Sequence, residues 1–354
     1  DDNPHDMVDQ FAGLWLVDDG IAAAAAFIEP FFSASPSVGV DVPLSQAPSS
    51  DIHIAAMACS LSVCVNWVNH IKDAGELLGW TVDTVAFDGT PEDTLDKVQA
   101  AIDSGVDGIA INGVVRETFE LALADAIAND VAIVTQYVPE DLVEPPFIQV
   151  QGGLPTFAGL GEVLGNFVVA DSNGDANALY LDYANFPVSA TIVDTAAGVI
   201  EERCSTCETH SVTVQASDTG TALPGIVVSE LQRNEDINYV ILQDAVMGIG
   251  LDAALREAGL TDRVTIVGTN LTEDAVAATE SGLHLGYVNF SLKHAAYFIV
   301  DAFARHFVGD PLQDYVMMKQ IMTAETLGAI PAGLSSDDNP HDMVDQFAGL
   351  WLVD

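Results

Sequence analysis

Short apolar runs alternate along the chain with longer stretches in which apolar residues recur every three or four positions. The short runs predict β-strands at 52–58, 81–87, 108–111, 131–135, 178–181, 209–215, 239–242 and 264–268. The longer stretches predict helices at 63–78, 91–104, 116–129, 156–170, 189–203, 221–233, 245–258 and 272–282. Strands that alternate with helices at this spacing are typical of βαβ units. We therefore expect an α/β fold with two doubly wound parallel sheets, each covered by helices on both faces.

Charge and composition exclude several classes of function. The 354 residues include 10 basic and 53 acidic side chains, for a net charge of −43, and 49% of residues are hydrophobic. That hydrophobic share is enough to form cores, so disorder is excluded. Nucleic acids and anionic lipids are bound through Lys and Arg, so neither is an expected partner. No apolar run approaches the roughly 20 residues that span a bilayer, and the first residues lack the basic region of a signal peptide. We expect no direct membrane insertion, and any signal peptide to have been removed.

The acidic excess has two interpretations. One is a surface adapted to high salt, where screening suppresses the repulsion between like charges. The other is a surface that binds cations. The acidic residues are scattered along the chain rather than clustered, which favours the high-salt interpretation.

The four cysteines form two close pairs, Cys59 with Cys64 and Cys204 with Cys207. Two local pairs favour small disulfide loops made in an oxidising compartment. Zinc binding would require the two pairs to converge, and a redox motif would require a thiolate at a helix start. The pairs lie about 140 residues apart, and Cys204 follows a predicted helix instead. We expect disulfides, no metal and a secreted, extracellular or cell-surface location.

An exact internal repeat stands at the two ends of the chain. Residues 1–18 and residues 337–354 share the sequence DDNPHDMVDQFAGLWLVD without a difference. The repeat indicates either a tandem array of similar units or a redundancy without structural meaning. Residues 19–50, which include a Ser- and Pro-rich stretch, are expected to form a linker.

The repeated segment has the pattern of a short amphipathic helix. Met343, Val344, Phe347, Leu350 and Trp351 fall on one face at helical spacing. An isolated helix this short is marginal, so it must dock on another surface. It either covers its own domain or links a neighbouring copy, in which case Phe347, Leu350 and Trp351 are the assembly residues.

The stretch from 52 to about 319 resembles the type I periplasmic sugar-binding proteins that feed ABC importers. The first half carries Leu-Gly-Trp at a helix end, an Asp-Gly turn and then IDSGVDGI. The second half carries GVIEERCSTCETHSV and SELQRNEDINYVILQDAVMGIGLDAALREAGLTDRVTIVGTN. Members with this cysteine pattern are mostly actinobacterial. The resemblance implies two lobes joined by a hinge that the chain crosses three times, closing on a small ligand. It places lobe 1 at 51–148 with 284–310 returning, lobe 2 at 149–283, a hinge strand and tail at 311–336, and a C-terminal helix at 337–354.

Polar residues that follow predicted strands are the candidate ligand-binding residues, because ligands of open parallel sheets bind beyond the carboxyl ends of the strands. Sugars require bidentate polar partners and an aromatic face. The candidates are Ser60, Ser62, Asn112, Arg116, Gln136, Tyr137, Asn185, Asp244 and Asn270. Each could instead serve a turn or a helix cap. Trp67 is expected in the core rather than at the ligand.

Two functions remain open at this point. No serine-hydrolase elbow, zinc-protease motif or phosphate-binding loop is present, so we expect neither an enzyme nor a cofactor. One hypothesis is an extracellular solute-binding protein whose partners are a small polar ligand and an ABC importer. The other is a structural repeat unit of an extracellular filament or array whose partners are copies of itself. The second is favoured by the repeat and by Gln136, Asn270 and Phe290, which stand where relatives commonly carry charged or polar ligand residues.

Overall fold

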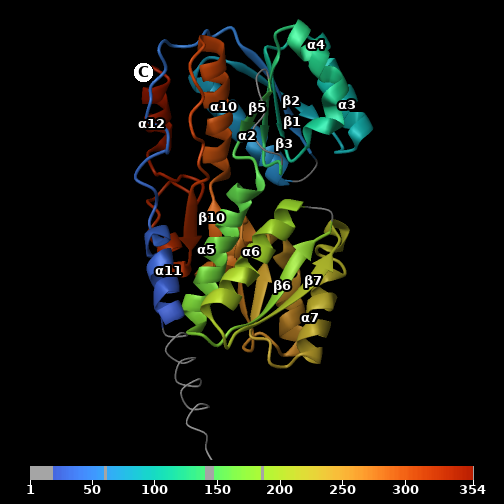
Figure 1. Ribbon diagram of the computed structural model, residues 1–354, viewed down its shortest axis with the longest axis vertical. Helices are drawn as coiled ribbons and strands as arrows, with labels where there is room; N and C mark the ends of the chain where they lie inside the picture. The colour runs from blue at the N-terminus through green and yellow to red at the C-terminus, as the bar shows by residue number, and fades with distance from the viewer. Residues whose placement is uncertain (1–18, 60–61, 140–146, 185–186, 354) are drawn as a thin grey trace, which may run out of the picture. The chain divides into compact units, whose positions relative to one another are not determined.

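The computed structural model describes residues 19–59, 62–139, 147–184 and 187–353, which form two units, each built around one sheet (Figure 1). The five-stranded unit comprises Ala34–Thr156, Ser291–Met318 and the segment from Gly333 onward. The six-stranded unit comprises the described residues up to Ser33 together with Phe157–Phe290 and Lys319–Ala332. The predicted α/β class with two largely parallel sheets is confirmed.

The chain passes between the units more often than the resemblance implies. The passages follow Ser33, Thr156, Phe290, Met318 and Ala332, which makes five rather than three. The first passage arises because residues 19–33 pack in the six-stranded unit, before the chain enters the five-stranded one. The last arises because the segment from Gly333 onward returns to the five-stranded unit.

The five-stranded sheet has the order β2-β1-β3-β4-β5, and all its pairings are parallel. Its elements are β1 (His53–Ala58), α2 (Ser62–Leu77), β2 (Thr81–Ala86), α3 (Pro91–Asp103), β3 (Gly108–Asn112), the 3₁₀ helix η2 (Arg116–Ala122), α4 (Leu123–Ala128), β4 (Ala132–Gln136), β5 (Phe147–Val150), α10 (Leu292–Val308) and α12 (Met343–Leu350). Successive strand residues point to opposite faces and so enter two cores. Ile54 and Ala56 join the core under α2 and α10, whereas Ala55 and Met57 join the core under α3 and α4.

The six-stranded sheet has the order β11-β10-β9-β8-β6-β7, with only the β10–β11 pair antiparallel. Its elements are the 3₁₀ helix η1 (Glu29–Phe32), α5 (Leu154–Ser172), β6 (Asn177–Tyr183), α6 (Pro187–Arg203), β7 (Glu208–Val214), η3 (Ala216–Asp218), α7 (Leu223–Arg233), β8 (Tyr239–Leu242), η4 (Ala245–Gly248), α8 (Leu251–Ala258), β9 (Thr265–Thr269), α9 (Glu273–Glu280), β10 (Gly286–Phe290), β11 (Lys319–Met322) and α11 (Ala324–Gly328).

Two glycines set the close packing of α5 against α6. A Cβ atom at Gly161 would lie 2.2 Å from the Ile192 carbonyl oxygen, and one at Gly165 would lie 2.6 Å from the Ala196 carbonyl oxygen. Both distances are far below van der Waals contact, so only glycine allows the helices to approach this closely.

Two of the expected boundaries differ in the structure. Residues 19–28 form a helix that continues into η1, so the linker expected at 19–50 begins only after Ser33. Even there the chain is packed, because Val38, Val40 and Leu44 are buried in the core under α10. The return to the first sheet begins at Ser291 rather than at 284, because 286–290 pairs with β9 and β11 in the six-stranded sheet.

The C-terminal segment covers its own unit. Helix α12 lies beside α10 (Figure 1), and Met343, Phe347 and Trp351 are fully buried there. The backbone N–H of Leu44 donates to the Leu350 carbonyl at 2.9 Å. Phe347, Leu350 and Trp351, the expected assembly residues, therefore pack within this unit. The identical segment 1–18 lies outside the described residues.

Candidate functional site

Two predicted residues, Asp244 and Asn270, converge with Tyr183 at the carboxyl edge of the six-stranded sheet. Tyr183 ends β6, Asp244 follows β8 by two residues, and Asn270 directly follows β9. These strands are neighbours in the order β9-β8-β6, so parallel pairing brings their carboxyl ends to one edge. The three side chains therefore lie at adjacent strand ends, the position at which such sheets bind ligands.

Asp244 is the central anion of this edge. Its Oδ2 accepts a hydrogen bond from Asn270 Nδ2 at 2.7 Å, and its Oδ1 accepts one from the backbone N–H of Val246 at 2.9 Å, which caps η4. Burial raises the pKa of the Asp244 carboxyl, and these two hydrogen bonds oppose that effect. A carboxylate can accept about four hydrogen bonds, so Asp244 can also accept from ligand hydroxyl groups.

Tyr183 adds an aromatic hydroxyl beside Asp244. Its hydroxyl oxygen lies 2.7 Å from Thr219 Oγ1. Burial raises the pKa of Tyr183, the hydrogen bond with Thr219 opposes this, and the charge of Asp244 adds to the rise. Ser189 fixes the turn after β6, since its Oγ donates to Asp182 Oδ1 at 2.6 Å and accepts from the Tyr183 N–H at 3.2 Å.

The backbone at Asn270 is specialised. Its φ is +56°, a left-handed conformation that asparagine tolerates better than most residues. The next residue is held by Asn289, whose Oδ1 accepts from the Leu271 N–H at 2.9 Å. The backbone around Asn270 is thus held in place at the point where its side chain contacts Asp244.

Besides Tyr183, two further residues of this edge were not among the sequence candidates. Thr219 holds the Tyr183 hydroxyl, and Lys319 begins β11 opposite Phe290, the last residue of β10. Burial lowers the pKa of Lys319, and the nearby Glu162 carboxylate opposes this. Thr219 comes after the carboxyl end of β7, so a search for polar residues that follow strands could have included it. Lys319 is the first residue of an antiparallel strand, and such a search misses residues at strand starts.

Four candidates lie at the carboxyl edge of the five-stranded sheet, which the structure describes as a separate unit. Asn112 ends β3 and is paired in register with Gln136, which ends β4. Tyr137 follows with a φ of +57°, and burial raises its pKa. Arg116 begins η2, and its guanidinium lies 4.0 Å from the Glu120 carboxylate in a partly exposed pair.

Gln136 serves the packing of this unit. Its side chain is fully buried, and its Oε1 accepts from Trp67 Nε1 at 2.6 Å. Its Nε2 donates to Gln151 Oε1 and to the Ala295 carbonyl, both at 3.0 Å. A ligand contact at Gln136 would have to replace these bonds. Trp67 is fully buried, as expected for a core residue.

The structure describes only one of the three remaining candidates. Ser62 is the first residue of α2, whereas Ser60 and Asn185 fall outside the described residues. The Cys59–Cys64 disulfide links the residue that follows β1 to the first turn of α2.

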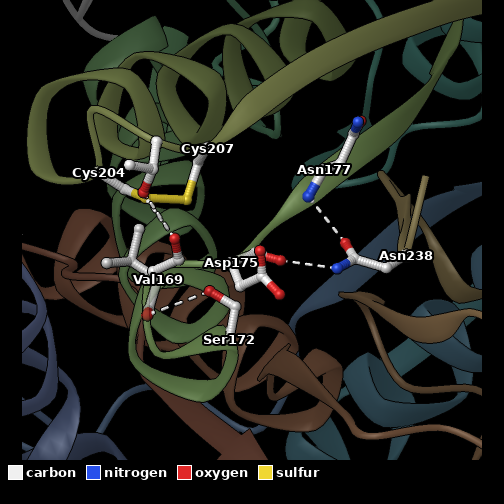
Figure 2. Close-up of a disulfide and its surroundings, with 9 residues drawn as sticks. Val169, Ser172, Asp175, Asn177, Cys204, Cys207 and Asn238 are labelled. Atoms are coloured by element: carbon white, nitrogen blue, oxygen red, sulfur yellow. Dashed lines mark hydrogen bonds between the residues drawn. A yellow bond between two sulfur atoms is a disulfide. The ribbon is translucent and has the colours of Figure 1, made fainter. Parts of the chain in front are cut away.

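The second disulfide, Cys204–Cys207, follows the end of α6 (Figure 2). Cys204 is buried, and Thr206 Oγ1 donates to the Gly174 carbonyl at 2.8 Å, which ties this loop to the turn between α5 and β6. Asn238 holds the same turn, since its Nδ2 donates to the Asp175 carbonyl at 2.6 Å and its Oδ1 accepts from the Asn177 N–H at 2.7 Å (Figure 2). Both expected disulfides are therefore present and support local structure.

Within the described ranges, no group of three or more His, Cys, Asp or Glu side chains is arranged to hold a metal ion. None of the helices described there is both long and apolar enough to cross a bilayer.

The chain has recognisable relatives among protein families and solved structures. Residues 61–311 match the family model described as "Periplasmic binding protein domain". The sequence has no significant match among curated proteins.

Three solved structures illustrate the structural similarity. A 5-methylthioribose transporter solute-binding protein from Thermotoga lettingae has a TM-score of 0.69 at 15% identity, covering 88% of this chain and 99% of its own. A periplasmic solute-binding protein from Actinobacillus succinogenes with bound D-allose has a TM-score of 0.68 at 15% identity, covering 79% and 100%. A Mycobacterium smegmatis protein in complex with β-D-fucofuranose has a TM-score of 0.67 at 19% identity, covering 80% and 94%. At these identities the similarity establishes the shared fold.

Proposed function

Since the chain belongs to the periplasmic binding protein domain family, we propose that it is a solute-binding protein that captures a small polar ligand, such as a sugar, for an ABC importer. Proteins of this family are solute-binding proteins rather than enzymes, and they are secreted or extracellular. Disulfides in both units agree with an oxidising compartment.

The observation that carries the proposal is the Asp244–Asn270 pair next to Tyr183. A carboxylate and a carboxamide 2.7 Å apart offer acceptors and donors to vicinal hydroxyl groups. The phenol adds an apolar face and a further hydroxyl. These groups suit a neutral polyol or sugar, and the solved structures above with sugar-like ligands support that choice.

Isothermal titration calorimetry against a panel of pentoses, hexoses and methylthio sugars tests the proposal. At least one member should give a saturable signal with a Kd in the micromolar range or tighter. The Asp244→Ala variant should lose that signal while its circular dichroism spectrum stays unchanged. Silence across the panel, for a protein shown to be folded, would remove sugar binding from the proposal.

The alternative of a filament or array unit lacks a supporting surface in the described chain. The residues that would link neighbours, Phe347, Leu350 and Trp351, are buried within their own unit. We therefore place solute binding ahead of it.

A further inference from the structure

The site that holds the C-terminal segment is filled by a sequence that the chain carries twice. Residues 1–18 are identical to residues 337–354, so each chemical group with which 337–353 contacts the five-stranded unit also exists in 1–17. We propose that residues 1–18 of a second chain occupy this docking site when a chain's own C-terminal segment is displaced, producing an assembly linked by segment exchange.

The docking site is built for the apolar face of this sequence. The Phe347 ring packs against Tyr297 with centroids 5.2 Å apart, and Trp351 stacks on Tyr297 at 5.8 Å. His294 and Phe298, also on α10, lie 5.8 and 5.9 Å from the Phe347 ring. Burial of two whole aromatic side chains supplies most of the affinity expected for such a segment.

Polar contacts set the register of the segment. Asn339 Oδ1 accepts from the Ser35 N–H at 2.7 Å, and Gln346 Oε1 accepts from the Val38 N–H at 2.9 Å. Near the start of the segment, Asp338 pairs with Lys293 at 2.5 Å. The matching positions in the first copy are Asn3, Gln10 and Asp2. The site therefore selects this sequence rather than any amphipathic helix.

Each chain has one such site among its described residues and two segments able to fill it. The C-terminal copy follows directly on residues of the same unit, so its effective concentration is in the millimolar range typical of short tethers. The C-terminal copy therefore occupies the docking site in the intact chain, which is expected to be monomeric. The first copy binds only where the C-terminal copy has been weakened or removed.

A second chain is the source of the incoming segment. Only two residues separate Val17 from Gly20, and Gly20 is packed against the Arg203 backbone in the six-stranded unit. Two intervening residues span about 11 Å at most. If the first copy docked within its own chain, this tether would hold the two units to each other, whereas the copy of a second chain carries no such constraint.

Matched substitutions in the full-length chain test the proposal. Phe347→Ala with Trp351→Ala weakens the C-terminal copy, and Phe11→Ala with Trp15→Ala makes the same change in the first copy. Light scattering after size exclusion should show a dimer or larger species, growing with concentration, for the first pair only. The second pair should stay monomeric like the parent chain. The four-fold variant should also be monomeric and should melt at a lower temperature than the Phe347/Trp351 variant.

Two outcomes would overturn the proposal. If the Phe347/Trp351 variant is monomeric and melts with the four-fold variant, the first copy does not use the site. If it is monomeric but melts higher, the chain's own first copy fills the site, and a second chain is wrong. The milder pair Phe347→Leu with Trp351→Phe keeps most of the buried volume and must give the same result if the alanine variants do not fold.

A peptide provides an independent measurement. A fluorescent peptide with the sequence of residues 1–18 should bind the four-fold variant saturably and the parent chain not at all. Replacing its phenylalanine and tryptophan by alanine should weaken binding at least about tenfold. Equal binding of both peptides would also contradict the proposal.

Discussion

Trp351 donates its indole N–H to Asp301 Oδ1 at 2.9 Å inside the five-stranded unit. The other oxygen of the same carboxylate accepts from Arg305 Nε at 2.7 Å and from the Tyr315 hydroxyl at 2.8 Å. Arg305 also donates to the Val42 carbonyl at 2.6 Å. This buried network joins α10 to the C-terminal segment and to the stretch after Ser33, so the three segments should unfold together.

Trp351→Phe tests that link. The variant keeps an aromatic ring of smaller size but leaves one acceptor of Asp301 without its donor, which should cost about 1–3 kcal/mol in urea unfolding. Asp301→Ala should cost about 3–5 kcal/mol, because it leaves the buried Arg305 guanidinium without its anion.

Trp80→Phe is the matched control, because Trp80 Nε1 donates at 2.9 Å to the Ser49 carbonyl in the same unit and not to Asp301. Its cost should add to that of Asp301→Ala, whereas the cost of Trp351→Phe should not. Additivity for both tryptophans would mean that the Trp351–Asp301 bond contributes nothing to stability.

His294 should make the protein less stable in mild acid. Burial among Phe298 and Phe347 lowers its pKa to about 4, and the hydrogen bond with the Val38 carbonyl opposes this. The unfolded chain therefore binds a proton near pH 6.5 that the folded chain binds only near pH 4. Stability from this residue is full above pH 6.5 and falls as the pH drops toward 4, by up to about 3 kcal/mol.

Chemical denaturation of the parent chain and of His294→Phe between pH 7 and pH 4 measures this effect. The unfolding free energy of the parent should fall relative to that of His294→Phe as the pH drops, since only the parent has an imidazole that gains a proton on unfolding. A pH-independent difference for His294→Phe would contradict the assignment.

Asp244 should be required for ligand binding. Its removal takes away the central acceptor and leaves the Asn270 carboxamide without its partner. We expect Asp244→Ala to weaken binding of a panel ligand at least about a hundredfold, a loss of about 2.7 kcal/mol, and Tyr183→Phe to weaken it less. Asp274→Ala changes an exposed carboxylate of α9 in the same unit and should have no effect. Similar losses for Asp274→Ala and Asp244→Ala would indicate a nonspecific charge effect.

Salt should stabilise the folded state. A net charge of −43 gives strong self-repulsion, and raising the salt from 0.1 M to 1 M shortens the screening length from about 10 Å to about 3 Å. The Tm should therefore rise by several degrees in NaCl at pH 7. Near pH 4, where carboxylates begin to be protonated, the same salt should have a much smaller effect. An equal rise at both pH values would point to a general effect of salt on apolar burial instead.

The Cys204–Cys207 disulfide should stabilise the six-stranded unit modestly. It closes a loop of only four residues, for which chain entropy predicts about 2 kcal/mol. Replacing both cysteines by alanine should lower the urea midpoint of that unit by a corresponding amount. The same change at Cys59 and Cys64 should lower the midpoint of the five-stranded unit instead. Detection of reactive thiols in the unreduced, unfolded protein would show that the bridges are not formed.

Local features of this protein could be predicted from its sequence. The sequence predicts strand 239–242 with its observed bounds, because a four-residue apolar run between polar turns has few alternatives. Cysteines three and five residues apart favour local disulfides among the three possible pairings, and the structure has both local bridges. The same logic located Asp244 and Asn270, since the residue that follows a parallel strand lies at the carboxyl edge whatever the rest of the fold does.

Tertiary packing decided the features that depend on distant residues. Gln136 looked like Asn270 in sequence, but α10 packs over β4 and presents the Ala295 carbonyl to its amide, 159 residues away. The helix 343–350 showed its apolar face in sequence, but only the contacts with α10 reveal that this face covers its own unit. Periodicity reports which residues share a face, and strand order reports which ends share an edge. Neither can report what covers them, because that depends on free energies of packing between segments that lie far apart in the chain.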